Sequence, residues 1–179
     1  MDTKDMKFGT KAVHAGQHPD RETGALVAPM QLTSTFVFTP EKMARNLAGD
    51  KEGIFSYGRS KNPTQNSFQD KVASLEGGEA ALATGSGMAA ISLAILGSVH
   101  SGDHVISCNT VYGGTYALFS KIFKDFKIDV TFVHTTDEAE LEKALRSNTK
   151  MIYIESVLNP TMEIPNIEAA IKFGHEKGL

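Results

Sequence analysis

The chain lacks the features that mark secreted, membrane and nucleic-acid-binding proteins. Of its 179 residues only Cys108 is a cysteine, which excludes an internal disulfide framework. No apolar run is long enough to cross a bilayer, and the N-terminal residues lack the apolar core of a signal peptide. The formal net charge of −3 provides no basic field for nucleic acid. We therefore expect a cytoplasmic protein with no nucleic-acid or membrane partner.

Two common kinds of ligand site are also missing. No Gly-Lys-Ser or Gly-Lys-Thr triplet occurs, which excludes a P-loop nucleotide site. His100 and His104 have helical spacing, but the turn residues 101–103 break any helix between them, so no metal site is predicted. What is present is an ordinary globular composition, with 41% hydrophobic and 22% charged residues.

The first third of the chain differs from the rest. Residues 1–60 are rich in glycine, threonine, proline and polar residues, with only short apolar pieces such as 35–38. A segment with so little regular pattern usually needs another surface to order it. We predict an N-terminal arm over residues 1–60 that packs on a partner subunit.

Strand and helix patterns alternate from residue 61 to residue 179. Asn62-Pro63 is a helix start and Gly77-Gly78 a helix end, with Phe68, Val72 and Leu75 on one apolar face between them. Asp137 and Glu140 form a predicted capping box. The later expected elements are strands 80–84, 104–108, 129–133 and 151–155, and helices 87–96, 113–124, 137–145 and 167–177.

This alternation predicts an α/β fold with a mainly parallel sheet and helices on both faces. Such a pattern calls for another strand after the last helix, but the sequence ends at Leu179. The expected domain over 61–179 is therefore incomplete, and a small complete sheet of about four strands is the alternative.

The most informative segment is Ala80–Ile91, where small residues join a predicted strand to a helix. A turn of this kind presents free N–H groups at the positive end of the helix dipole and binds phosphate. The spacing Gly85-x-Gly87-x-x-Ala90 matches a dinucleotide fingerprint, but a lone match is weak. The ribose-binding acid expected about 20 residues later is absent at 107–109, which disfavours a nicotinamide cofactor.

Three further motifs accompany this turn. Tyr57-Gly58-Arg59 offers a hydroxyl and a permanently charged guanidinium for a phosphate. Tyr112-Gly113-Gly114 places an aromatic ring after a strand, where it can lie flat on a planar ligand. The stretch from Glu155 to Asn159 follows a strand at the sheet edge that holds ligands in open α/β folds.

As an ordered set, these motifs resemble the pyridoxal-phosphate enzymes of cysteine and methionine metabolism, which have fold type I. The resemblance implies that Tyr57 and Arg59 hold the cofactor phosphate of a neighbouring subunit, in a homodimer or homotetramer with shared sites. It implies that Gly87 and Met88 hold the chain's own cofactor phosphate. Tyr112 would stack on the pyridine ring and assist substrate deprotonation, and Asn159 would contact the ring's 3-oxygen. Glu155 would lie close by, as a further candidate for contact with the cofactor.

The same resemblance implies carbon–sulfur chemistry on a sulfur amino acid, by elimination or γ-replacement. The family's cofactor-anchoring Ser-x-Thr-Lys motif and its Asp-Asn-Thr motif do not occur in these residues, so we expect this portion to be inactive alone. Gly114 stands where methionine γ-lyases commonly carry cysteine, which tilts the prediction away from that subgroup. The resemblance implies an enzyme similar to the cystathionine and methionine γ-lyases. The alternatives are an O-acetylhomoserine sulfhydrylase, a cystathionine γ-synthase, or a non-catalytic truncated interaction protein.

Overall fold

The computed structural model describes residues 5–179. The chain divides into two compact units, Met1–Ala83, described from residue 5, and Thr84–Leu179. Each unit is considered on its own. Within the described residues, no helix has both the length and the apolar character needed to span a membrane.

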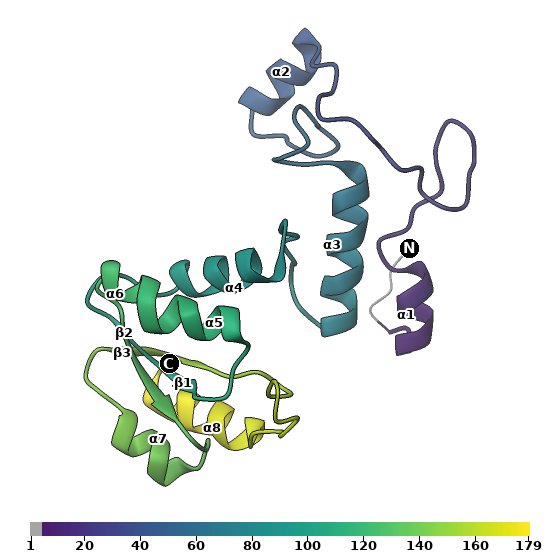
Figure 1. Ribbon diagram of the computed structural model, residues 1–179. Helices are drawn as coiled ribbons and strands as arrows, with labels where there is room; N and C mark the ends of the chain where they lie inside the picture. Colours follow the sequence, from purple (N-terminus) through teal and green to yellow (C-terminus); the bar gives the residue numbers. More distant parts are fainter. Residues whose placement is uncertain (1–4) are drawn as a thin grey trace. The chain divides into compact units, whose positions relative to one another are not determined.

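The described residues of the first unit form three helices and almost no core. These helices are α1 (Phe8–His14), α2 (Pro40–Leu47) and α3 (Pro63–Glu76) (Figure 1). The α3 helix begins as predicted, because the Asn62 side chain accepts the Thr64 N–H and Pro63 occupies the first turn. It ends at Gly77 in the left-handed conformation, with φ of 66°.

The helix α1 lies alongside α3 because the chain at Gly16 comes close to the α3 backbone. A β-carbon on Gly16 would overlap the Ser67 carbonyl, and φ there is +68°. Lys71 on α3 donates to the carbonyls of Ala12 and Val13 at 3.0 and 3.1 Å. Of the described residues of this unit, only Ala15 and Ile54 have buried apolar side chains.

One expectation for this part of the chain is wrong. The segment 80–84 is not a strand: its residues have no ladder partner among the described ones, and Leu82 is 72% exposed. A strand forms only beside a neighbour that accepts its backbone hydrogen bonds. Of the three residues expected on the apolar face of α3, Val72 and Leu75 are half-buried and Phe68 is 59% exposed.

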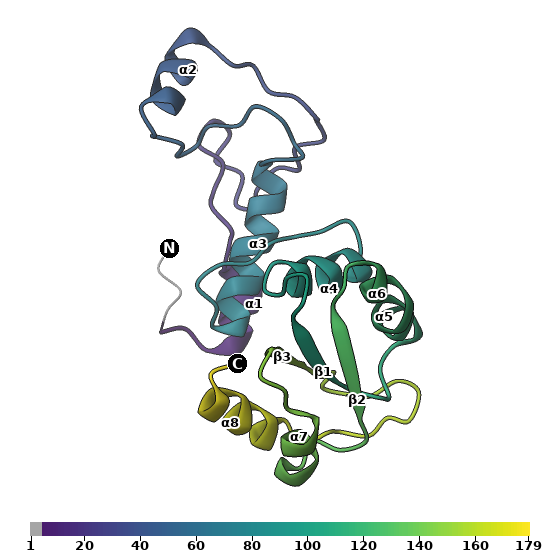
Figure 2. The ribbon, with the colours of Figure 1, turned by 90° about the vertical axis from the view of Figure 1, so that its left-hand side faces the viewer.

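The second unit is a three-stranded parallel sheet with helices on both faces, as the alternation predicts. The strand order is β2-β1-β3, so that the first strand along the chain lies in the middle (Figure 2). The strands are β1 (His104–Cys108), β2 (Asp129–Val133) and β3 (Thr149–Tyr153). The helical elements are α4 (Gly87–Leu96), α5 (Gly113–Ala117), η1 (Leu118–Ile122), α6 (Phe123–Asp125), α7 (Glu138–Ala144) and α8 (Ile167–Lys177).

Alternation along the central strand divides the core into two layers. Val105 packs against Ile95, Phe119 and Phe123, on the side of α4 to α6. Its neighbour Ile106 faces the other way and packs with residues of α7 and α8. Both views show these two helical layers on opposite sides of the strands (Figures 1 and 2). Every residue of β1 is buried, as expected for a central parallel strand.

Three elements of this unit differ in detail from expectation. The predicted helix 113–124 is interrupted by the π-helical turn η1. The third strand begins at Thr149 rather than 151, because Thr149 pairs with His104 of β1. The predicted capping box is not formed: Asp137 makes no side-chain cap bond, and Glu140 accepts instead from the amides of the preceding loop.

A buried histidine ties the strands together at their N-terminal ends. His104 is fully buried, and its ring nitrogens lie 2.8 Å from the hydroxyls of Thr149 on β3 and Thr131 on β2. Burial lowers the pKa of His104 to about 4, with the charge of Arg146 adding to the effect. A neutral imidazole therefore belongs to the folded sheet.

Candidate functional site

The start of α4 has the geometry of an anion-binding helix terminus. Ser86 is extended, and its hydroxyl accepts the Ala89 N–H at 3.1 Å, which caps the helix. The amides of Gly87 and Met88 precede the first intrahelical bond and have no hydrogen-bond partner among the described residues. A β-carbon on Gly85 or Gly87 would meet nothing within 4 Å, so the space above this terminus is open. These features suit a phosphate group.

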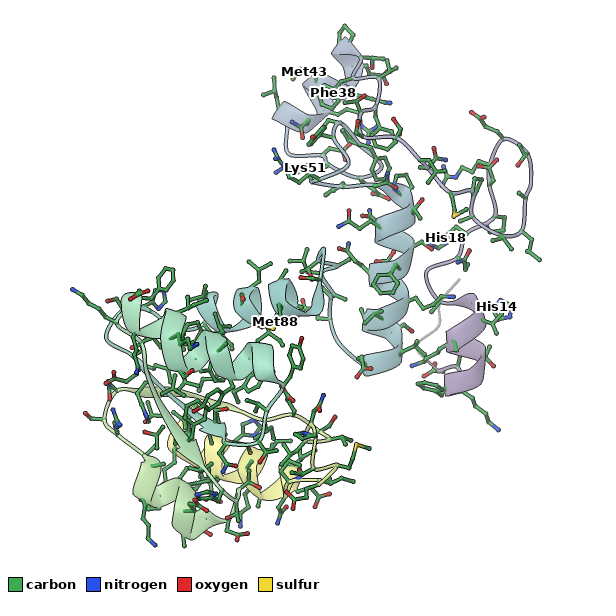
Figure 3. The ribbon with its side chains drawn as sticks, in the orientation of Figure 1. His14, His18, Phe38, Met43, Lys51 and Met88 are labelled. Carbon is green, nitrogen blue, oxygen red and sulfur yellow. The ribbon has the colours of Figure 1, made fainter. Side chains whose placement is uncertain are left out.

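Tyr112 lies beside this helix start. It follows β1 as the residue before α5, and its side chain is 51% exposed. A β-carbon on Gly114 would lie 2.6 Å from Cε1 of Tyr112 and 3.0 Å from Sδ of Met88. Both side chains therefore lie against Gly114, and Met88 is at the start of α4 (Figure 3). The missing β-carbon at this position leaves the space that the two side chains occupy.

Glu155 connects the ends of β1 and β3. One carboxylate oxygen accepts the Tyr112 backbone N–H at 3.0 Å. The other lies 3.4 Å from the Thr115 hydroxyl and 3.3 Å from the Tyr153 hydroxyl. Burial, and secondarily the Glu155 charge, raises the pKa of Tyr153, so that its hydroxyl stays protonated and can donate.

Asn159 lies in the loop after β3, at the same end of the sheet. Its neighbour Leu158 is buried against Cys108 and Val111, which places the loop beside the end of β1. The loop is closed by bonds between Leu158 N and the Glu163 carbonyl and between Met162 N and the Leu158 carbonyl. The Asn159 side chain is exposed and available to a ligand. Cys108 is a buried core residue, as predicted, and burial raises the pKa of its thiol.

Tyr57 and Arg59 belong to the other unit, where they form a small structure of their own. Tyr57 makes an antiparallel bridge with Thr35, and the Gly58 N–H donates to the Ser34 carbonyl at 2.7 Å. The Arg59 guanidinium lies 5.2 Å from the centre of the Tyr57 ring. Arg59 forms no ion pair with any residue that the structure describes.

The described residues of the second unit thus bring Gly87, Met88, Tyr112 and Glu155 together. Sequence reasoning missed Thr115 and Tyr153, which complete the Glu155 network. The only signal for them was position: Thr115 follows the Tyr112-Gly-Gly turn, and Tyr153, the last residue of β3, precedes Glu155 by two residues. No group of residues suited to hold a metal ion occurs in the described part of the chain.

A parallel α/β sheet with an open helix terminus and an exposed aromatic ring beside it defines a class: proteins that hold a phosphorylated, planar cofactor. The fit is chemical as well as spatial, because free amides face the open space and an aromatic ring borders it. The particular family follows from comparison with known proteins. Residues 9–179 match the model of the Cys/Met metabolism PLP-dependent enzymes, and the chain belongs to that family.

Similar proteins differ in the reaction that they catalyse. The chain is 41% identical over 176 residues to an L-methionine gamma-lyase of Fusobacterium nucleatum, matching 98% of this chain and 44% of that protein. It is 38% identical to a homocysteine/cysteine synthase of Saccharomyces cerevisiae, over 96% of this chain and 39% of that protein. A cystathionine gamma-lyase of Lactobacillus plantarum, solved in complex with L-serine, superposes with a TM-score of 0.83 and 36% identity, covering 97% of this chain and 43% of that one.

The chain therefore spans less than half the length of the relatives it matches. Membership of a PLP-dependent family sets aside the nicotinamide alternative, in agreement with the missing ribose acid. The fold expectation is confirmed by the same superposition: the parallel sheet is part of a fold-type I arrangement.

Proposed function

We propose that this chain supplies the phosphate-binding and ring-stacking side of a pyridoxal-phosphate enzyme acting on sulfur amino acids. In the proposed reaction, the substituent on the substrate's γ-carbon is eliminated or replaced, and a carbon–sulfur bond is broken or formed. The observation that carries the proposal is the open terminus of α4 beside the Tyr112 ring. Relatives named as a methionine gamma-lyase and a homocysteine/cysteine synthase support the substrate class.

Each proposed site residue has a distinct task. The amides of Gly87 and Met88 bind the phosphate, and the Tyr112 ring stacks on the pyridine and assists proton transfer from the substrate. The Asn159 amide contacts the ring's 3-oxygen. When bound, pyridoxal phosphate supplies the electron sink that makes the substrate Cα–H acidic. The residues of this chain orient that ring and limit its movement.

We propose further that residues 1–60 pack on a second subunit and deliver Tyr57 and Arg59 to its cofactor phosphate. Large apolar side chains of this arm lie in solvent, including Leu32 at 91% and Met43 at 47% exposure (Figure 3). The Arg59 guanidinium has no carboxylate partner among the described residues, so its charge is free for an anion. A cytoplasmic homodimer or homotetramer with shared sites is the assembly this implies.

Gly114 bears on which subgroup of the family this chain resembles most in activity. The Tyr112 ring occupies space that a β-carbon at position 114 would need, so a cysteine there would move the ring. We therefore propose a cystathionine γ-lyase, cystathionine γ-synthase or sulfhydrylase type of activity in preference to methionine γ-lyase.

The proposal is tested by removing one phosphate donor without disturbing the helix. In Gly87→Pro, the proline occupies the first helical position, where it is tolerated, and the extended Ser86 before it is compatible with proline. The variant lacks the Gly87 N–H. The matched control is Gly87→Ala, which keeps the N–H and adds a β-carbon into open space.

We expect pyridoxal phosphate, followed by its absorbance in equilibrium dialysis, to bind Gly87→Pro about tenfold more weakly than wild type. Gly87→Ala should bind as wild type does, and pyridoxal without phosphate should not distinguish the variants. Equal binding by all three proteins would contradict the site. Absence of binding together with capture of a full-length relative would favour the non-catalytic interaction protein.

A further inference from the structure

The contacts of Glu155 point into the protein rather than toward the open site. Its two carboxylate oxygens receive the Tyr112 N–H and approach the hydroxyls of Thr115 and Tyr153. Of these, the N–H contact at 3.0 Å has standard hydrogen-bond length, whereas the hydroxyl contacts at 3.3 and 3.4 Å are longer. The principal bond therefore joins the carboxylate to the backbone of the ring-bearing residue.

The bond from the Tyr112 N–H to Glu155 stabilises the start of α5, which has no side-chain cap of its own. Tyr112 precedes α5 without any side-chain cap bond of its own, and the glycines at 113 and 114 leave the chain free to move. Glu155 comes from the end of β3, 43 residues away in sequence, and so ties this flexible turn to a second strand. A charged acceptor near a helix start is also favoured by the helix dipole.

The other side of the network is anchored in the core. Thr115 is fully buried. Tyr153 packs edge-on against the buried Phe119, with ring centres 5.2 Å apart and an interplanar angle of 88°. The carboxylate thus links a rigid part of the sheet to the turn that carries Tyr112.

We infer that Glu155 is a positioning residue, which fixes the Tyr112 backbone at the start of α5 and so sets where the Tyr112 ring lies. It does not itself contact the cofactor. This inference rests on the proposed function only in treating the Tyr112 ring as a cofactor contact; the restraint on the turn stands without it.

Amide hydrogen exchange of the 179-residue chain, without cofactor, tests the restraint. Glu155→Ala should accelerate exchange in peptides covering residues 112–116 by about tenfold, with β1 still protected. Glu155→Gln keeps an oxygen that can accept the Tyr112 N–H and should remain within about threefold of wild type. Glu155→Asp keeps the charge but withdraws the oxygens by one methylene, and should loosen the turn.

The two conservative variants separate geometry from charge. If only the negative charge matters, Asp will match wild type and Gln will not, which overturns the inference. Glu168→Gln, on the exposed first turn of α8, is the charge-matched control and should change nothing. Unchanged exchange at 112–116 in every Glu155 variant would also overturn it. If Glu155→Ala loses protection in β1 as well, the variant disturbs the whole sheet. The comparison of Glu155→Asp with Glu155→Gln then still decides whether geometry or charge holds the turn.

Pyridoxal phosphate binding then tests the route by which Glu155 acts. If it acts only through Tyr112, adding Glu155→Gln or Glu155→Asp to Tyr112→Ala will not weaken binding further than Tyr112→Ala alone. Additive losses would mean direct contact and would contradict the inference. A chain that binds no pyridoxal phosphate at all refutes the proposed function instead, while the exchange data still decide whether Glu155 holds the turn.

Discussion

The two units of this chain differ in what holds them together. Residues 84–179 bury aliphatic and aromatic side chains on both faces of a parallel sheet. The described part of residues 1–83 has only two buried apolar side chains, Ala15 and Ile54, and is joined mainly by backbone and polar contacts. The difference indicates that the second unit has a hydrophobic core of its own, whereas the first leaves many large apolar side chains exposed.

The proposed site residues are also divided between the two units. Gly87, Tyr112 and Glu155 stand on elements fixed by a core, which suits groups that must hold a ligand in one orientation. Tyr57 and Arg59 stand on a unit with little core. Changes that affect the two units unequally therefore test the comparison.

The largest expected effect comes from emptying the core of the second unit. Phe119 is 1% exposed and contacts the rings of Phe123, Phe132 and Tyr153. Phe119→Ala should lower the free energy of unfolding by about 3–5 kcal/mol. In the first unit, Phe68→Ala should change it by less than about 0.5 kcal/mol, since Phe68 is 59% exposed. Urea unfolding measures the free energy of unfolding of both variants. Similar losses in the two would contradict the difference in core packing between the units.

Acid should weaken the second unit through His104. The pKa of the buried imidazole falls from 6.5 to about 4 on folding, so the folded state favours the neutral ring. Its contribution is complete above pH 6.5 and is lost as the pH falls toward 4, by at most about 3 kcal/mol. The pH dependence of unfolding should be shallower in His104→Gln than in wild type. Parallel pH profiles would show that His104 does not titrate in this way.

A smaller effect is expected where the Tyr112 ring meets Met88. Gly114→Ala introduces a β-carbon 2.6 Å from the Tyr112 ring, but the side chains of Tyr112 and Met88 in its way are able to turn. We expect a loss of about 1 kcal/mol in unfolding free energy, with weaker pyridoxal phosphate binding because the ring is displaced. Gly113→Ala is the control, because its β-carbon would meet nothing within 4 Å. Equal effects of the two changes would argue against a ring held over Gly114.

The smallest effect on stability is expected in the arm. Leu32 and Val37 are 91% and 78% exposed, so replacing both with serine removes no core. Unfolding free energy should stay within about 0.5 kcal/mol of wild type. Self-association, measured by sedimentation, should nevertheless weaken. Strong destabilisation without any change in association would mean that the arm packs within its own chain.

Much of the second unit was predictable because its signals are local. The strands at 104–108 and 129–133 and the helix from Ile167 to Lys177 follow from apolar periodicity and a terminal glycine. Gly178 is left-handed, with φ of 72°. The segment 80–84, which was expected to be a strand and is not, shows the limit of such signals. An apolar stretch of sequence does not by itself provide a neighbouring strand with which to pair.

The site was predictable only in part. The helix terminus at Gly87 and the exposed ring of Tyr112 are visible in short motifs. The bond from Glu155 to the Tyr112 amide spans 43 residues and depends on the parallel pairing of β1 with β3. Likewise, Glu140 suggested a capping box locally but serves the loop at His134 and Thr135 in the fold.

The most direct test is residue-resolved amide exchange of the chain with and without pyridoxal phosphate. The account predicts strong protection in β1 to β3 under both conditions, weak protection over residues 5–60, and new protection with cofactor at Gly87 and Met88. Cofactor-dependent protection elsewhere, with these amides unchanged, would contradict the assignment of the site.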